Sequence, residues 1–403
     1  MLCGDRTDAL QHLLFEVAEG EVRCRIGLSR FRVHANSTEA REASIGGIGG
    51  YGGGLNIKGG NSGITVMNRG AASTVNRHEG LNLRGTRGFS GNRRVMTMAN
   101  ATTGELKSIE LANESLRLEL APELGAGVAR LRFITTSGEV DVWRPAPADA
   151  HHFNQLSNYI LAPWCNRIDG AAFDFDGRRH TLKSNWHDGS AIHGDVNQRA
   201  WRLTDRSPVS ARFELRADTR ERNWSWPFEA TARYELQDAA LVVELEIRNL
   251  GGSPMPAGLG MHPFWMQHLK HADELAVVTM NLAGRYPVER VMVTGPAVRE
   301  ELCDRLTAGT TISEPLDDVF CGFQGAEIRW PKSRVMARMT AGPENKHAVI
   351  YHEPPHDWFC LEPVSMANNG ISMRALVPGT GVRVVNPKQT ISSWYRFEFI
   401  EEA

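Results

Sequence analysis

From about residue 105 onward, apolar and polar residues alternate in short runs, and this alternation limits the possible folds more than any other feature of the chain. Leu116, Leu118 and Leu120 occupy every second position, and a longer run from 228 to 236 repeats the pattern. Because successive side chains of a strand point to opposite faces, each run predicts a strand with one buried face. Gly, Pro, Asn and Asp separate the runs, which is typical of antiparallel strands joined by turns.

Further alternating runs lie at residues 128–133, 240–250, 382–387 and 392–402. A hairpin is predicted around Asp176-Gly177, a pair suited to a two-residue turn. Residues 149–161 are the best candidate for a helix, which Pro163 would end. We therefore expect an all-β domain over residues 98–403, built as one large antiparallel β-sandwich with a wide concave face.

The first 97 residues differ in composition from the rest. Residues 1–95 contain 18 of the 39 glycines, and the stretch IGGIGGYGGGLNIKGGNSG has almost no apolar periodicity. Such a chain buries too little apolar surface to offset the entropy lost on ordering. We expect residues 1–97 to be a low-complexity extension that is disordered or lies outside the native protein. The G-x-G-x-x-G at residues 47–52 lacks the strand and helix that flank a dinucleotide site.

The composition argues against several classes of function. The formal net charge is −2, which gives no general attraction for nucleic acid or anionic membranes. No apolar run reaches the roughly 18 residues of a membrane span, and the acidic start does not resemble a signal peptide. A cytoplasmic protein with reduced cysteines is therefore expected. No Cys or His pair has the spacing of a zinc site, so no metal is expected.

Several polar side chains stand in apolar surroundings, as functional residues on a rigid scaffold often do. They lie in the segments CNRI (Asn166, Arg167), IHGD (His193), MHPFW (His262), PLDDVF (Asp317, Asp318) and WFCLEP (Glu362). Each also has a structural interpretation. Arg167 could pair with a carboxylate of the fold such as Glu362, and His193 could be an ordinary structural histidine. The two aspartates could form an acidic turn.

His262 and Glu362 have the surroundings expected of proton-transfer groups. Gly258 and Gly260 allow another group to approach closely, and Pro263 fixes the backbone after His262. A rigidly held histidine can donate or accept a proton near neutral pH. Glu362 follows an apolar run, and desolvation of this kind raises the pKa of a carboxylate.

Taken in order, the five segments resemble those of the aldose 1-epimerases, also called mutarotases, over about residues 105–400. The resemblance implies a galactose mutarotase-like β-supersandwich that interconverts the α and β anomers of a free aldose such as glucose or galactose. It implies Glu362 as the general base, His262 as the general acid, and Asn166, Arg167, His193 and Asp317 as sugar-binding residues, with Asp318 as an alternative to Asp317. The reaction requires no redox cofactor, and the expected partner is a small sugar.

Three other functions remain open. A hexose-phosphate mutarotase would need further cations near the phosphate, for which Arg178 and Arg179 are candidates. A non-catalytic sugar-binding protein would use the same aromatic and polar groups. A glycoside hydrolase would need a second carboxylate beside Glu362, for which Asp317 or Asp318 is available. The sequence does not indicate an oligomeric state.

Overall fold

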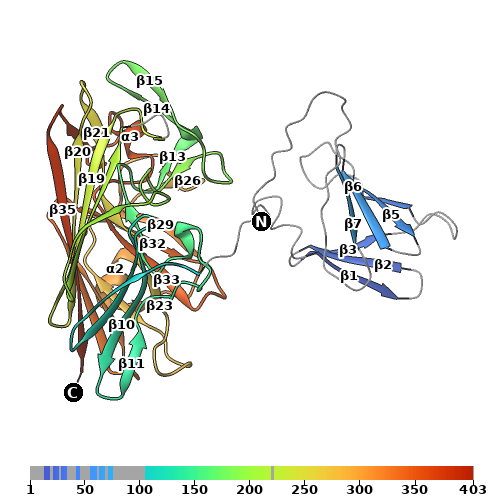
Figure 1. Cartoon of the computed structure of the whole chain (residues 1–403), viewed down its shortest axis with the longest axis horizontal. Helices are drawn as coiled ribbons and strands as arrows, with labels where there is room; N and C mark the ends of the chain where they lie inside the picture. The colour runs from blue at the N-terminus through green and yellow to red at the C-terminus, as the bar shows by residue number, and fades with distance from the viewer. Residues whose placement is uncertain are drawn as a thin grey trace. The chain divides into compact units, whose positions relative to one another are not determined.

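The computed structural model describes residues 105–218 and 222–402 with their side chains, and the backbone of seven strands between residues 13 and 75. The chain forms two units, Met1–Asn100 and Ala101–Ala403 (Figure 1). The strands of the first unit form two antiparallel sheets, one of β1 (Leu13–Ala18), β2 (Glu21–Ile26) and β3 (Ser29–Val33), the other of β4 (Glu42–Ile45), β5 (Leu55–Gly60), β6 (Gly63–Asn68) and β7 (Ala71–Val75). The sequence analysis expected residues 1–97 to be a disordered or non-native extension. Most of these positions lie outside the described residues, so this expectation stays a prediction.

Two large antiparallel sheets dominate the second unit, so the prediction of an all-β fold is confirmed. The nine-stranded sheet contains, from edge to edge, β17 (Arg202–Arg206), β18 (Ser210–Ala217), β19 (Phe228–Gln237), β20 (Ala240–Asn249), β35 (Thr390–Glu401), β31 (Val335–Ala341), β30 (Ala326–Trp330), β24 (Val277–Met280) and β28 (Thr310–Thr311). The seven-stranded sheet contains β12 (Ile160–Leu161), β22 (Gly260–Met261), β33 (Trp358–Val364), β32 (His347–His352), β29 (Leu316–Cys321) and β25 (Gly284–Arg285), with β23 (Phe264–Met266) also paired to β33.

Shorter elements complete the unit. A four-stranded sheet has the order β11 (Gly138–Asp141), β10 (Gly127–Thr135), β9 (Leu116–Ala121) and β8 (Ile109–Ala112). The two-stranded pairs are β13 (Arg167–Ile168) with β16 (Ala191–Ile192), β14 (Ala172–Phe175) with β15 (Arg178–Thr181), β21 (Met255–Ala257) with β34 (Arg383–Val385), and β26 (Val288–Glu289) with β27 (Met292–Val293). The short helices are η1 (Phe153–Gln155), η2 (Asp169–Ala171), α2 (Glu301–Ala308) and α3 (Gly370–Met373).

Strands β19 and β20 illustrate how the alternating sequence forms a sheet. Tyr234 pairs with Val243 in register, and both side chains are fully buried. One position further along, Arg233 pairs with Glu244, and their side chains form an ion pair of 3.7 Å on the outer face. Directly paired residues share a face of the sheet. The apolar set of both strands is therefore buried on the inner face.

The two large sheets pack against each other through aromatic side chains. The ring centroid of Trp265 in β23 lies 6.0 Å from that of Phe397 in β35, and Trp143 meets Phe397 edge-on at 4.9 Å. All three side chains are fully buried. Contacts of this kind, between strands of different sheets, form the core of a sandwich. Trp265 therefore belongs to the core, although it stands in the segment MHPFW.

Two local predictions have different outcomes. The hairpin around Asp176-Gly177 is confirmed, since β14 pairs with β15 and the two turn residues have φ values of 52° and 72°. Residues 149–161 do not form an α-helix. Only Phe153–Gln155 adopts a 3-10 turn, and Ile160–Leu161 forms β12. Backbone pairing of β12 with β22 replaces the hydrogen bonds that a helix would make.

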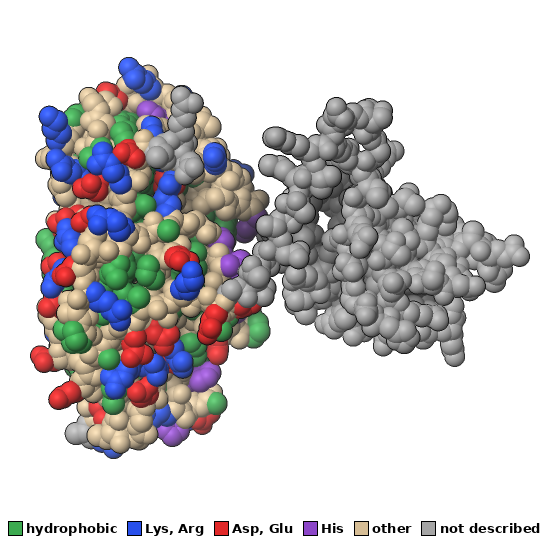
Figure 2. Space-filling view, viewed as in Figure 1, with side chains coloured by type: hydrophobic (Ala, Val, Ile, Leu, Met, Phe, Trp, Pro, Cys, Tyr) green, Lys and Arg blue, Asp and Glu red, His purple; other side chains and the backbone are tan. Residues whose placement is uncertain are grey.

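The surface of the second unit carries both signs of charge. On the face shown in Figure 2, basic and acidic side chains are interspersed with apolar ones. Exposed cross-strand ion pairs contribute to this pattern, such as Arg338 Nη2 with Glu327 Oε1 at 3.2 Å. Within residues 105–218 and 222–402, no helix combines the length and the apolar character required to cross a membrane.

Candidate active site

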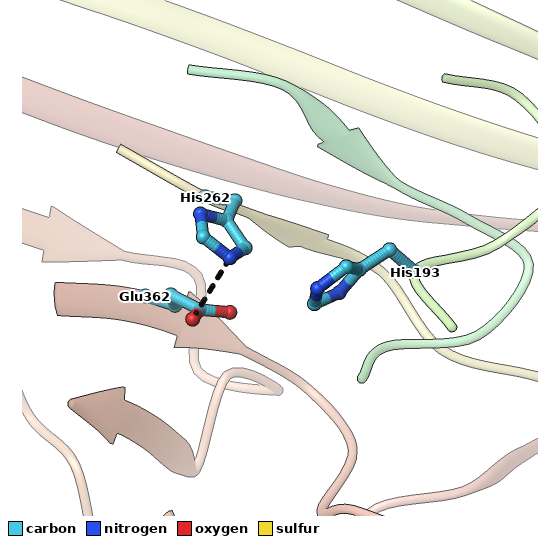
Figure 3. Close-up of side chains that lie close together, drawn as sticks. All are labelled: His193, His262 and Glu362. Atoms are coloured by element: carbon cyan, nitrogen blue, oxygen red, sulfur yellow. Dashed lines mark ion pairs between the residues drawn. The ribbon is translucent and has the colours of Figure 1, made fainter. Parts of the chain in front are cut away.

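Three of the expected site residues meet inside the second unit (Figure 3). His193 follows β16, His262 lies between β22 and β23, and Glu362 lies in β33. The distance from His262 Nε2 to Glu362 Oε1 is 3.1 Å. One side-chain N or O atom from each of the three residues lies within 4.8 Å of the other two. The side chains of His262 and Glu362 are only 7% and 2% exposed, so an imidazole and a carboxyl group interact out of contact with bulk water.

The strand register decides which of the two neighbouring aspartates faces this site. In β32, Val349 pairs with Glu362 and Tyr351 pairs with Asp317. Because Val349 and Tyr351 are two positions apart, their partners project from the same face of the sheet. Asp318 projects from the opposite face and forms an ion pair of 2.8 Å there. The structure therefore brings Asp317, and not Asp318, to the site.

A short ladder brings Asn166, Arg167 and His193 together. Strand β13 pairs with β16, and the His193 backbone N–H donates to the Asn166 carbonyl at 2.9 Å. Asn166 and His193 both have left-handed φ values, 51° and 64°, so the chain turns sharply at both ends of the ladder. Arg167 Nε donates to Asp188 Oδ2 at 3.0 Å, and Arg167 Nη1 lies 3.5 Å from Asp317 Oδ2. Arg167 therefore pairs with two carboxylates of the fold, neither of which is Glu362.

The orientation of the His262 ring is set by its neighbours. Its backbone N–H donates to the Tyr159 carbonyl at 3.0 Å and to Asn158 Oδ1 at 2.9 Å. The His262 ring stacks on the Tyr159 ring at 4.4 Å and lies 4.8 Å from the Phe264 ring. A Cβ at Gly260 would lie 2.7 Å from a side chain of β33, so glycine allows the two strands to approach. These contacts hold Nε2 of His262 toward Glu362.

Burial controls the protonation of the His262–Glu362 pair. Loss of solvation raises the pKa of Glu362 well above its ordinary range, and the charge of Asp317 raises it further, against the opposing effect of Arg167. Loss of solvation also lowers the pKa of His262 to about 3. Both shifts disfavour the charged form, so burial works against a carboxylate–imidazolium pair in the free protein. An acid role for His262 requires an imidazolium, which burial disfavours.

Two neighbouring groups are also shifted. Burial raises the pKa of Asp317 to about 6, although Arg167 opposes the rise. Burial, followed by the charges of His262 and Arg167, lowers the pKa of His193 well below its ordinary value. The exposed fraction of the side chains increases from 2% at Glu362 through 11% at Arg167 to 28% at Asp317. The site is therefore closed at Glu362 and accessible to solvent at Asp317.

The sequence model of the family described as aldose 1-epimerase matches residues 107–398. The chain belongs to the aldose 1-epimerase family. The resemblance inferred from the five segments is thereby confirmed.

Several known proteins are similar to this chain. The Escherichia coli K12 protein YphB, described as uncharacterized, is 25% identical over 246 residues, which cover 55% of this chain and 80% of YphB. The crystal structure of the GalM/aldose epimerase homologue from C. elegans has a TM-score of 0.64 at 18% identity and covers 74% of this chain and 99% of its own. A galactose mutarotase-like protein from Clostridium acetobutylicum has a TM-score of 0.63 at 18% identity, with coverage of 74% and 99%. These two structures support the galactose mutarotase-like fold.

In this member of the aldose 1-epimerase family, the same three side chains are also a possible metal-binding set. Two imidazoles and one carboxylate are ligands that zinc accepts. Their positions along the chain are too far apart for sequence spacing to predict such a set. Metal-bound histidines usually donate their second ring N–H to an acceptor. Among the described residues, Nδ1 of His193 and Nδ1 of His262 have no hydrogen-bond partner. The arrangement therefore suits proton exchange with a polar ligand better than a resident metal.

Sequence reasoning missed two residues of this candidate site. Asp188, which pairs with Arg167, stands in a turn-like HDG segment that gave no functional signal. Tyr159 is fully buried and stacks on His262, but it lies in the segment for which a helix was expected. Tyr159 directly precedes β12, and this strand has only two residues, so the sequence has no alternating pattern that would show which way Tyr159 points.

Proposed function

We propose that the protein is an aldose 1-epimerase that interconverts the α and β anomers of a free aldose such as glucose or galactose. The observation that carries this proposal is the buried contact of 3.1 Å between His262 Nε2 and Glu362 Oε1. Changing the anomer of a cyclic hemiacetal requires one group that takes the proton of the O1 hydroxyl and another that protonates the ring oxygen. No redox change and no hydrolysis take place, so a paired acid and base are sufficient for the chemistry.

In the ring-opening step, Glu362 as carboxylate takes the O1 proton while His262 as imidazolium protonates the ring oxygen. The bond between C1 and the ring oxygen breaks, and C1 becomes an aldehyde carbon. Rotation about C1–C2 presents the other face of the carbonyl. Ring closure then reverses both proton transfers and returns the opposite anomer.

The number of protons on the pair explains how a buried, neutral pair can take part in this cycle. Carboxylate with imidazolium and carboxylic acid with imidazole hold the same number of protons. Ring opening converts the first arrangement into the second, and ring closure restores the first. Burial favours the neutral arrangement in the free protein. Sugar hydroxyls that donate to Glu362 stabilise its carboxylate and so shift the proton to His262.

The remaining residues would bind the sugar. Asp317 would accept hydrogen bonds from hydroxyls at the accessible side of the site. Arg167 and Asn166 would present donors to ring or hydroxyl oxygens, since their side chains lie together at the end of the β13–β16 ladder. His193, neutral and in edge contact with the His262 ring at 4.9 Å, would complete the inner wall.

A free sugar fits the charges better than a phosphorylated one. Arg167, which the sequence analysis assigned to sugar binding, is already paired with Asp188 and Asp317. Arg179 lies on the exposed β15 strand and pairs with Asp174 at 3.0 Å. A phosphate group is best held by several arginine or lysine donors. The hexose-phosphate alternative is therefore less well supported.

Polarimetry of freshly dissolved α-glucose and α-galactose tests the proposal. The wild-type protein should accelerate the drift to the equilibrium rotation, whereas Glu362→Gln, which keeps the shape but cannot exchange a proton, should lose at least about 100-fold in turnover. Glu274→Gln is the matched control, because Glu274 is also buried but accepts hydrogen bonds from backbone N–H groups of Lys332 and Ser333. This variant should lose stability and keep its turnover.

The outcomes separate the alternatives. A wild-type protein that binds galactose without accelerating the drift would be a sugar-binding protein. Release of the chromophore from a chromogenic glycoside would indicate a hydrolase. A Glu362→Gln variant with wild-type turnover would exclude Glu362 as the base.

A further inference from the structure

We propose that the Tyr159 hydroxyl is a further catalytic group, which donates a hydrogen bond to the sugar oxygens that react between Glu362 and His262. This inference rests on the proposed function. Tyr159 lies directly before β12 and is fully buried. Its ring stacks on His262 at 4.4 Å with an interplanar angle of 22°, and meets His193 edge-on at 5.6 Å. A single aromatic ring therefore contacts both histidines of the site.

The hydroxyl of Tyr159 differs from those of the other tyrosines that the structure describes. Tyr234 donates to the Ala126 carbonyl at 2.7 Å, Tyr351 donates to Glu353 at 2.9 Å, and Tyr286 and Tyr395 also have partners. The Tyr159 hydroxyl is buried and has no hydrogen-bond partner among the described residues. A buried hydroxyl without a partner costs free energy, and a fold rarely retains one without a reason.

The surroundings of this hydroxyl suit a donor to the sugar. Burial raises the pKa of Tyr159 well above its ordinary value, the Glu362 carboxylate raises it further, and Arg144 and Arg167 act in the opposite direction. The group therefore keeps its proton and lies within the electrostatic range of Glu362 and Arg167. Glu362 Oε2 and His262 Nδ1 are likewise buried without a partner among residues 105–218 and 222–402. The Tyr159 hydroxyl is therefore one of three buried polar atoms without a partner on the three residues Tyr159, His262 and Glu362.

A fixed donor at this place would contribute to catalysis in a defined way. When O1 loses its proton to Glu362, negative charge develops on the sugar until the bond between C1 and the ring oxygen has broken. A neutral hydroxyl that is already desolvated can stabilise this charge without reorganising water. Tyr159 itself loses no proton in the step, so the proton balance between Glu362 and His262 is unchanged.

Packing provides the competing explanation, and it requires only the ring of Tyr159. Tyr159→Phe keeps the ring and removes the hydroxyl, so it separates the two explanations. Its matched control is Tyr234→Phe, since Tyr234 is also fully buried but uses its hydroxyl in a structural hydrogen bond. Turnover by polarimetry, galactose affinity by calorimetry and melting temperature should be measured for both variants and the wild type.

Opposite effects are expected in the two variants. Tyr159→Phe should lose about 100-fold in turnover with an unchanged or higher melting temperature, because it gives up no hydrogen bond within the protein. Tyr234→Phe should melt at a lower temperature and keep its turnover. Wild-type turnover and wild-type galactose affinity in Tyr159→Phe would overturn the inference. If the wild type itself had no epimerase activity, the proposed function would fail, and the affinity of Tyr159→Phe for galactose would still decide whether the hydroxyl touches the sugar.

Discussion

Glu362 and His262 lie in a contact that would be an ion pair at the surface, but the fold removes water from them, which raises the pKa of Glu362 and lowers that of His262. A buried ion pair repays its loss of solvation only when further hydrogen bonds satisfy its remaining atoms. Glu362 Oε2 and His262 Nδ1 lack such bonds among the described residues. A sugar that supplies hydroxyls to these atoms would make the charged arrangement accessible, so substrate binding and proton transfer are linked at the scale of single residues.

The titration of a single residue, Asp317, should set the pH dependence of kcat/KM. With its pKa raised to about 6, Asp317 is a carboxylate above that pH and a weaker acceptor below it. We expect kcat/KM to fall as the pH decreases through about 6, and Asp317→Asn to be low and independent of pH in this range. His262, with its pKa lowered to about 3, should contribute no change near pH 6.5. Initial rates by polarimetry between pH 5 and about 8, where His is the usual titrating side chain, provide the measurement.

Asp318 offers the control for that experiment. It is the next residue of β29 but faces away from the site and pairs with Arg285 at 2.8 Å. Asp318→Asn should lower stability and keep the wild-type dependence on pH. A fall in kcat/KM near pH 6.5 that persists in Asp317→Asn would instead mean that His262 titrates as an ordinary histidine.

At the scale of elements, very short strands hold the site. Strands β12, β13, β16 and β22 contain two residues each. The turn after β16 passes close to the segment after β12, where Ala162 and Gly194 form an isolated bridge. A Cβ at Gly194, which has a φ of 91°, would lie 2.0 Å from the Ala162 carbonyl oxygen. Glycine is therefore required next to His193 to place this histidine beside His262.

Gly194→Ala should accordingly damage both stability and activity. The clash forces the β16 turn away from Ala162, and we expect the melting temperature to fall by roughly 5–10 °C together with a loss of turnover. Gly189→Ala is the matched variant, since Gly189 has a similar φ of 86° but nothing within 4 Å of an added Cβ. It bears only the left-handed strain of about 1–2 kcal/mol. Equal melting temperatures for the two variants would contradict this account.

The long strands could be predicted from the sequence, whereas the short elements could not. Long alternating runs identified β9, β10, β19, β20 and β35, because a period of two over many residues is unambiguous. The two-residue strands are too short to show a period of two. Residues 149–161 have a helix-like sequence, but pairing of β12 with β22 makes their last two residues a strand. Helix α2 (Glu301–Ala308) was not identified either. These elements owe their conformation to partners that are distant in sequence.

At the scale of the whole molecule, all the proposed site residues belong to the unit Ala101–Ala403. The family match at residues 107–398 also lies within this unit. We expect a chain that begins at Met98 to fold and to show the kcat/KM of the full chain. Circular dichroism, thermal unfolding and polarimetry of both chains provide the comparison. A truncated chain that unfolds, or that loses turnover while folded, would show that residues 1–97 contribute to the domain.

By itself, the sequence determined the all-β class, the antiparallel sandwich and the set of polar residues from which a site could be built, because alternation and local motifs are properties of neighbouring residues. Only the tertiary structure decided that His262 Nε2 and Glu362 Oε1 lie 3.1 Å apart, that Asp317 rather than Asp318 faces them, and that Tyr159 lies against His262. Strand register determines which distant residues share a face. Burial, which depends on every group packed around a side chain, determines how the pKa values of Glu362 and His262 are shifted.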